Sequence, residues 1–126
     1  MSKSDPKWRK APQSDDYRAA LNYLSLIYPL RRARKLVATL RRARTVTHAA
    51  KDLLRASDLP LLAREDVHVD HDLQRIHKGK SVSPVLLIQG DASRGLPLVV
   101  ADGYHRICAI CYYAENAPVA CRIVAD

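Results

Sequence analysis

The sequence lacks any apolar segment of membrane-spanning length. Its longest uninterrupted apolar runs, such as residues 84–88 and 96–101, have the length of strands, whereas a bilayer-spanning helix needs about 20 apolar residues. The amino terminus is polar and has no small-residue cleavage site after an apolar core, so it does not read as a secretory signal. We therefore expect no membrane span and a cytoplasmic location.

Cysteines and aromatic residues are also few. The three cysteines, Cys108, Cys111 and Cys121, are an odd number in a chain with no export signal, which argues against a disulfide framework and for reduced thiols. Aromatic residues make up 6% of the chain, so the basic stretches offer little aromatic interleaving for stacking single-stranded bases.

The positive charge is concentrated in one half of the chain. Residues 1–66 hold 15 lysines and arginines against 7 acidic residues, whereas residues 67–126 hold 6 of each. An asymmetry of this kind suggests an acidic partner such as DNA or RNA, and solubility is the alternative explanation.

The first half is predicted to be helical. Residues 1–13 are expected to form a flexible leader around Trp8, and residues 14–66 a basic helical segment. Ser14 followed by two acidic residues predicts a helix start, and Pro29 its end. A third helix is expected to start near Thr47.

Residues 30–44 form the most distinctive helical pattern. Apolar residues recur on one side of the predicted helix, and six cations fall on the other: Arg31, Arg32, Arg34, Lys35, Arg41 and Arg42. This cationic face could contact nucleic-acid phosphates, remain solvated, or meet an anionic membrane surface. An apolar side left exposed on the N-terminal helices would also allow a homodimer.

The second half, residues 67–126, is predicted to alternate short helices and strands. Residues 68–72 are expected to be a polar link before a short helix that ends at Gly79. The runs 85–88 and 98–101 are predicted to form a hairpin, residues 104–114 a helix and residues 119–124 a closing strand. The expected fold class is therefore α+β, with a short mixed sheet.

The working site is predicted where a strand turns into a helix, at Asp102-Gly103-Tyr104-His105-Arg106. Free amide groups at a helix N-terminus favour an anion, and glycine lets the backbone approach a phosphate closely. The Arg106 guanidinium and the His105 ring can donate to phosphate oxygens. Asp102 could hold a hydrated Mg²⁺ or act as a catalytic base. A capped turn with surface basic residues is the alternative.

This half of the chain resembles the ParB/sulfiredoxin-like superfamily, in its Asp-Gly-x-His-Arg form. The resemblance rests on the proline-led strand at 83–88, the second strand, the junction at 102–109 and the closing strand. In that superfamily the junction binds nucleotide phosphates: ATP in sulfiredoxin, CTP in chromosome-partitioning ParB proteins and ADP in free serine kinases. The resemblance implies an ATP, ADP or CTP cofactor, bound through Gly103, Tyr104, His105 and Arg106.

Three further points follow from the resemblance. Arg75 and Lys80 lie on the preceding helix, which faces the nucleotide in relatives, so they are additional candidates for nucleotide binding. Sulfiredoxin places a nucleophilic cysteine where this chain has Tyr104, so sulfiredoxin chemistry is not expected. ParB partition proteins add a helix-turn-helix and a dimerisation domain after the motif domain, so a partition role is not expected either.

Two clusters could also hold a metal. Cys108 and Cys111, with Cys121 on a neighbouring strand and His105, could bind zinc, although cysteines three apart on a helix are also ordinary core residues. His68, Asp70, His71 and Asp72 could form another site, with a polar loop as the alternative.

Two functions are therefore predicted. The first is a nucleotide-binding protein with phosphotransferase or nucleotide hydrolase chemistry, in which Asp102 serves as Mg²⁺ ligand or base. The second is a nucleic-acid-binding protein, with or without nuclease activity, that uses the basic helix on backbone phosphates.

Overall fold

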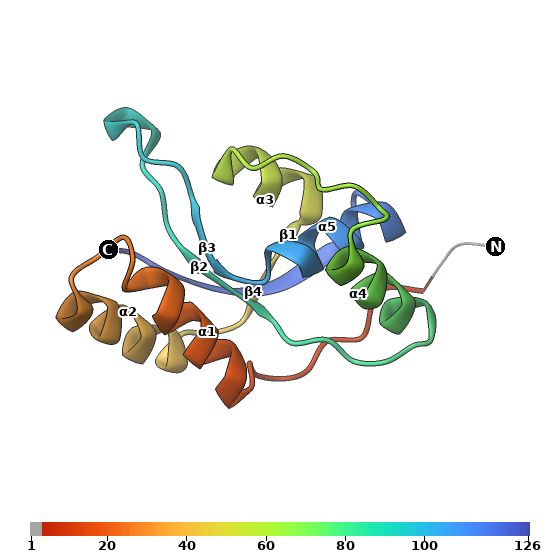
Figure 1. Ribbon diagram of the computed structural model, residues 1–126, viewed down its shortest axis with the longest axis horizontal. Helices are drawn as coiled ribbons and strands as arrows, with labels where there is room; N and C mark the ends of the chain where they lie inside the picture. Colours follow the sequence, from red (N-terminus) through yellow and green to blue (C-terminus); the bar gives the residue numbers. More distant parts are fainter. Residues whose placement is uncertain (1–3) are drawn as a thin grey trace.

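The computed structural model describes residues 4–126, so residues 1–3 of the predicted leader lie outside the described residues. The elements follow in the order α1 (Ser14–Leu24), α2 (Leu30–Arg42), β1 (Val46–Ala49), α3 (Ala50–Ser57), α4 (Val67–His77), β2 (Val85–Ile88), the 3₁₀ turn η1 (Ala92–Arg94), β3 (Val99–Asp102), α5 (Tyr104–Tyr113) and β4 (Pro118–Val124). The predicted α+β class is confirmed (Figure 1). Within residues 4–126, no helix has the length and apolarity needed to cross a bilayer.

The strands form one mixed sheet in the order β1-β4-β2-β3. β4 runs parallel to β2 and antiparallel to β1, with Cys121 opposite both Val85 and Val46. β2 and β3 pair as an antiparallel hairpin, as predicted, and a shift in register lies between Leu86 and Leu87. The sheet is therefore small and mixed, and β3 at its edge leads directly into α5.

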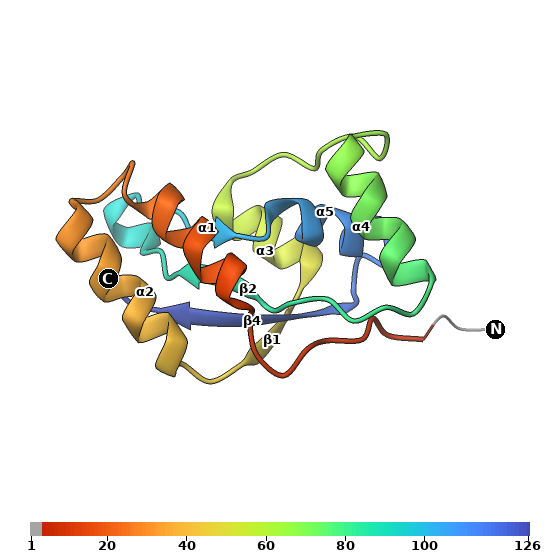
Figure 2. The same ribbon diagram turned by 60° about the horizontal axis from the view of Figure 1, so that its bottom comes forward.

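Helices cover both faces of this sheet. Side chains of β2 alternate between the two faces: Val85 and Leu87 pack with α3, α4 and α5, whereas Leu86 and Ile88 pack with α1 and α2 (Figures 1 and 2). A strand buried on both faces needs a continuous apolar run, and this requirement explains the sequence Val-Leu-Leu-Ile. Residues 14–66 and 67–126 contribute side chains to both cores.

Two local predictions in the first half of the chain are wrong. Thr47 does not begin a helix, because it lies in β1, where its backbone pairs with Ala120 of β4; the third helix begins at Ala50. The first helix begins at Ser14, as predicted, with Gln13 as its N-cap, but it ends at Leu24, five residues before Pro29.

The predicted polar link at residues 68–72 is also wrong, since these residues form the first turns of α4. The side chain of Asp66 accepts hydrogen bonds from the backbone N–H groups of His68 and Val69, at 2.9 and 3.1 Å. This N-cap starts the helix earlier than the apolar spacing indicated. As a result, His68 and His71 lie on a rigid helix rather than in a loop.

The stretch before α1 is joined to the rest of the fold. Trp8 pairs with Val82 in a parallel bridge, and its partly buried side chain packs against the core beneath α4 and α5. The Arg9 N–H donates to the Val82 carbonyl, and the Val82 N–H donates to the Lys7 carbonyl. Residues 7–9 are therefore held in place by backbone hydrogen bonds.

Candidate functional site

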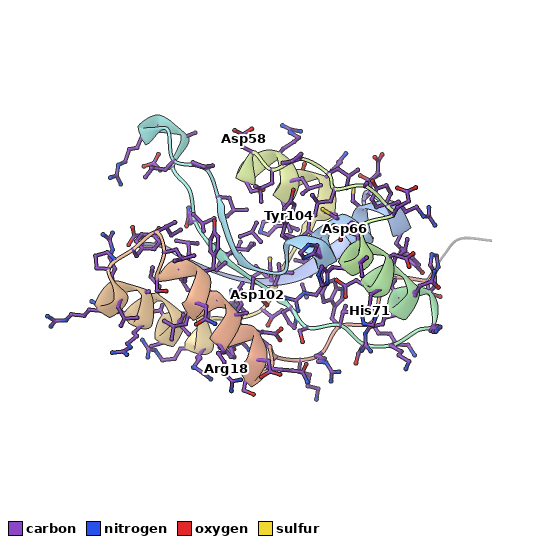
Figure 3. The ribbon with its side chains drawn as sticks, viewed as in Figure 1. Arg18, Asp58, Asp66, His71, Asp102 and Tyr104 are labelled. Atoms are coloured by element: carbon purple, nitrogen blue, oxygen red, sulfur yellow. The ribbon has the colours of Figure 1, made fainter. Side chains whose placement is uncertain are left out.

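A polar cavity of about 270 Å³ opens at the junction of β3 and α5. Its lining comes from α1, α4, β3 and α5: Asp16, His68, His71, Asp72, Asp102, Gly103, His105 and Arg106. Figure 3 shows Asp102 near the centre of the molecule, between α1 and α4, with His71 on α4. Four of the five residues of the predicted motif line this cavity.

Gly103 connects β3 to α5 with a backbone that other residues rarely adopt. It is the N-cap of α5, and its φ of 110° and ψ of 18° lie in the left-handed region. A Cβ atom at this position would lie 2.4 Å from Cγ1 of Val85. Glycine is thus required twice, by the turn and by the close approach to β2. The N-cap position consequently has no side chain that could cap the helix.

Arg106 is held between two carboxylates. Its Nη2 donates to Oδ2 of Asp102 at 2.5 Å, and its Nη1 donates to Oδ1 of Asp16 at 3.3 Å. The Asp16, Asp102 and Arg106 side chains are 13 to 17% exposed, so solvent screens these contacts weakly. Oδ2 of Asp16 also accepts from the backbone N–H of Gln13, which fixes the carboxylate at the start of α1.

The carboxyl group of Asp102 titrates well above its ordinary range. Burial raises its pKa from 3.8 to about 6; the positive charge of Arg106 opposes the rise, and the negative charge of Asp16 adds to it. One guanidinium cannot fully compensate two buried carboxylates, so Asp102 exchanges its proton close to physiological pH. This property suits a group that accepts or donates protons.

Histidines line the side of the cavity formed by α4 and α5. The rings of His68 and His105 have their centroids 4.9 Å apart, and Nε2 of His105 lies 4.0 Å from Oδ1 of Asp66. Asp72 lies on the same side, and burial raises the pKa of its carboxyl group, while Arg106 and His71 oppose the rise. The pKa of Asp66 shifts in the opposite direction, because the hydrogen bond from the Val69 backbone lowers it.

The remaining nucleotide-binding candidates lie away from the cavity lining. The Tyr104 hydroxyl donates to the carbonyl of Pro60 at 2.5 Å, so it ties α5 to the segment after α3. Arg75 donates to the carbonyl of Ser81 at 3.3 Å, and Lys80 is exposed beyond the end of α4. The structure brings together Asp102, Gly103, His105 and Arg106, and it leaves these three residues outside the group.

The basic face of α2 is present as predicted. Ala33, Leu36, Val37 and Leu40 are buried, and the six predicted cations are exposed on the other side: Arg31, Arg32, Arg34, Lys35, Arg41 and Arg42. Arg32 forms an ion pair with Asp126. The Arg41 guanidinium lies 4.2 Å from the centroid of the Tyr17 ring, in cation–π geometry.

The two predicted metal clusters do not assemble. In the part of the chain that the structure describes, no group of three or more His, Cys, Asp or Glu side chains is arranged to hold a metal ion. Cys108 and Cys121 are buried in the core, and burial raises the pKa of both thiols, that of Cys121 to about 11. Cys108 and Cys121 are therefore core residues, and Cys111 is partly buried against the same core. Asp70 does not join His68, His71 and Asp72 at the cavity.

Asp16 is the lining residue that sequence reasoning missed as a site residue. Together with Asp15 it indicated only a helix start, and no sequence signal links it to Arg106, 90 positions away. Comparison of the chain with protein-family models, with curated proteins and with solved structures finds no match in any of the three. The site is therefore interpreted from its own geometry.

Proposed function

We propose that the chain binds the phosphate groups of a nucleotide, together with Mg²⁺, at the β3–α5 junction. The observation that carries this proposal is the N-terminus of α5, whose N-cap, Gly103, borders the cavity. The first amide groups of any helix have no partner within the helix. Among residues 4–126 no side chain caps α5, and the contact with Val85 leaves no room for one at position 103. An external anion is the natural partner for these amides.

The lining of the cavity supports phosphate as that anion. Every lining residue is an acid, a histidine, an arginine or glycine, so the cavity has no apolar side chain against which a base could pack. Its volume of about 270 Å³ lies just below the usual range for small-molecule pockets, roughly 300–1,000 Å³. A cavity of this size and polarity fits the phosphate chain and leaves the base and sugar to adjacent surface.

Hydrogen-bond donors reach the cavity from two elements. Arg106 and His105 extend from the first turn of α5, and His68 adds a second imidazole from α4. Both guanidinium contacts of Arg106 are carboxylates, so a phosphate has to compete with Asp16 and Asp102 for this side chain. Binding is therefore expected to depend on what neutralises the acids.

The acids of the cavity fit a hydrated Mg²⁺ ion. Mg²⁺ in nucleotide sites is usually held by one or two carboxylates, several waters and the phosphates themselves, so a cage of three protein ligands is not required. Asp102 and Asp72 are the carboxylates that would hold it, and the ion would neutralise phosphate charge. Arg106 would then be released from Asp102, and its guanidinium could donate two hydrogen bonds to phosphate oxygens.

The same geometry points to a class of reaction. Asp102 lies at the cavity with a pKa of about 6 in the absence of a metal ion, so, where Asp72 rather than Asp102 holds the Mg²⁺, it can accept a proton from a hydroxyl group or a water molecule that attacks a phosphate. A base beside the phosphate site would suit a phosphotransferase or a nucleotide hydrolase. Phosphate binding is the primary proposal, and this chemistry is the activity it would support.

Isothermal titration calorimetry of the whole chain with ATP, ADP, CTP and GTP, each with and without Mg²⁺, tests the proposal. We expect one nucleotide to bind in the presence of Mg²⁺. His105→Ala should weaken this binding, because it removes an imidazole from the cavity while leaving the buried ion pairs intact. His48→Ala, at an exposed position in β1, is the matched control and should bind as the wild type does.

Two results would contradict the proposal. The first is the absence of heat with all four nucleotides, with and without Mg²⁺, from a protein that unfolds cooperatively. The second is nucleotide binding that His105→Ala and His48→Ala affect equally, since this would locate the ligand away from the cavity. Asp102→Asn offers a separate check of the role given to that carboxylate, because it should lower the dependence of binding on Mg²⁺.

A further inference from the structure

The turn between α1 and α2 exposes a cluster of large apolar side chains. We call this cluster the α1–α2 corner; it consists of Tyr23, Leu26, Ile27 and Leu30, which are 45, 81, 49 and 48% exposed. In the described part of the chain, these four residues are half of all the large apolar side chains that are exposed. A single exposed leucine is ordinary on a protein surface, but four within eight positions form a patch that favours an interaction.

A cationic surface adjoins this corner. Five of the exposed cations of α2 form no ion pair with any residue in 4–126: Arg31, Arg34, Lys35, Arg41 and Arg42. A groove of about 490 Å³ runs beside the same helix, lined by Arg31, Arg32 and Lys35, by Asp126, which pairs with Arg32, and by Pro29, Leu36, Thr39 and Ala125. Pro29 of the groove and Leu30 of the corner are consecutive residues at the start of α2, so apolar and cationic side chains lie close together there.

We propose that the α1–α2 corner and the exposed face of α2 dock on an anionic lipid bilayer. Apolar side chains at the tip can enter the boundary between headgroups and acyl chains, while arginine and lysine side chains meet the headgroup phosphates. A nucleic-acid backbone would match the cations but would leave Leu26 and Ile27 in water. A second copy of the chain would cover the corner but would bring two cationic faces together. An anionic bilayer offers an apolar environment to the α1–α2 corner and phosphates to the cations of α2.

Docking of this kind needs no rearrangement of the fold. The other side of α2 is buried against the sheet through Ala33, Leu36, Val37 and Leu40, so the cationic face is already directed outwards. Figures 1 and 2 both place the turn between α1 and α2 at the opposite end of the molecule from α4. A docked protein would therefore keep the cavity beside α4 and α5 open to solvent.

Co-sedimentation of the full chain with lipid vesicles tests this proposal. Vesicles of phosphatidylcholine alone are compared with vesicles of phosphatidylcholine and phosphatidylglycerol, at low and high salt. We expect binding to the anionic vesicles only, and weaker binding at high salt because the phosphate contacts are screened. The double variant Leu26→Ser with Ile27→Ser should lower the bound fraction roughly tenfold, since it removes the apolar insertion.

Control variants distinguish vesicle binding through this surface from non-specific adsorption to the vesicles. Leu96→Ser changes an exposed leucine in the β2–β3 hairpin and should leave vesicle binding unchanged. Arg31→Ser with Arg34→Ser should weaken binding to anionic vesicles, whereas Arg64→Ser, at an exposed position after α3, should have little effect. All of these positions are exposed, so the variants are expected to fold, and thermal unfolding of each one checks this point.

Four outcomes would overturn the proposal. They are failure to sediment with either vesicle, vesicle binding that Leu26→Ser with Ile27→Ser leaves unchanged, a dimer that this double variant dissociates, and binding of duplex DNA in place of vesicles. The last two would assign the surface to a second copy of the chain and to nucleic acid, respectively. Nucleotide binding at the cavity is measured separately and does not depend on any of these results.

Discussion

Substitution of Gly103 by alanine tests the geometry on which the candidate site rests. Two separate penalties are expected. A left-handed backbone costs a residue with a Cβ about 1–2 kcal/mol, and Gly103 has such a backbone, with a φ of 110°. The new Cβ would also meet Val85 Cγ1 at 2.4 Å, an overlap that the fully buried Val85 side chain cannot easily relieve. Such overpacking typically costs about 1–3 kcal/mol.

The sum predicts that Gly103→Ala lowers the free energy of unfolding by about 2–5 kcal/mol. Two other glycines separate the contributions. Gly79→Ala places a Cβ in open space at a φ of 74°, so it should show the backbone penalty of about 1–2 kcal/mol alone. Gly90 has no positive φ, but a Cβ added there would lie 2.6 Å from the Leu96 carbonyl oxygen. The loss of stability in Gly90→Ala should therefore come mainly from steric overlap.

Urea unfolding of the wild type and the three variants, followed by circular dichroism at one pH, measures these differences. Gly103→Ala should be less stable than Gly79→Ala by the overlap with Val85. Equal losses at the two positions would refute the reasoning, because they would mean that β2 does not approach the cap of α5 as closely as described.

Two further predictions concern acidic residues at the site. The native carboxyl of Asp102 keeps its proton up to about pH 6, whereas the unfolded one releases it near 3.8, so the free energy of unfolding should fall by about 3 kcal/mol as pH rises between these values. The urea midpoint measured from pH 4 to 7 should show this fall in the wild type and not in Asp102→Asn. If the midpoints of the two proteins change in parallel with pH, Asp102 is not the group whose titration lowers the stability. Asp66→Ala removes the N-cap of α4 and should lower the free energy of unfolding by about 1 kcal/mol. Asp70→Ala, which removes no cap, is its control, and equal losses in the two variants would count against the cap.

Several elements could be predicted from the sequence because their signals are local. The run Val85–Ile88 is bounded by a proline and by Gly90, and its continuous apolarity indicated a buried strand, whose two faces the structure shows packed in separate cores. The alternation of cations and apolar residues in α2 gave the orientation of that helix. The Asp102-Gly103 junction was found because a strand that stops at a glycine before a helical pattern is a short-range feature.

The sequence by itself thus determined α2, the hairpin, α5 and the motif at its start, since each depends on neighbours within a few positions. Only the tertiary structure decided the remaining features. β1 has an exposed and largely polar face, and it is a strand because β4 supplies its hydrogen-bonding partner. Asp16 belongs to the site because α1 packs across β3, which brings its carboxylate to Arg106. Contacts between residues so far apart along the chain leave no periodicity in the sequence, and burial beside Asp16 and Arg106 is what moves the pKa of Asp102.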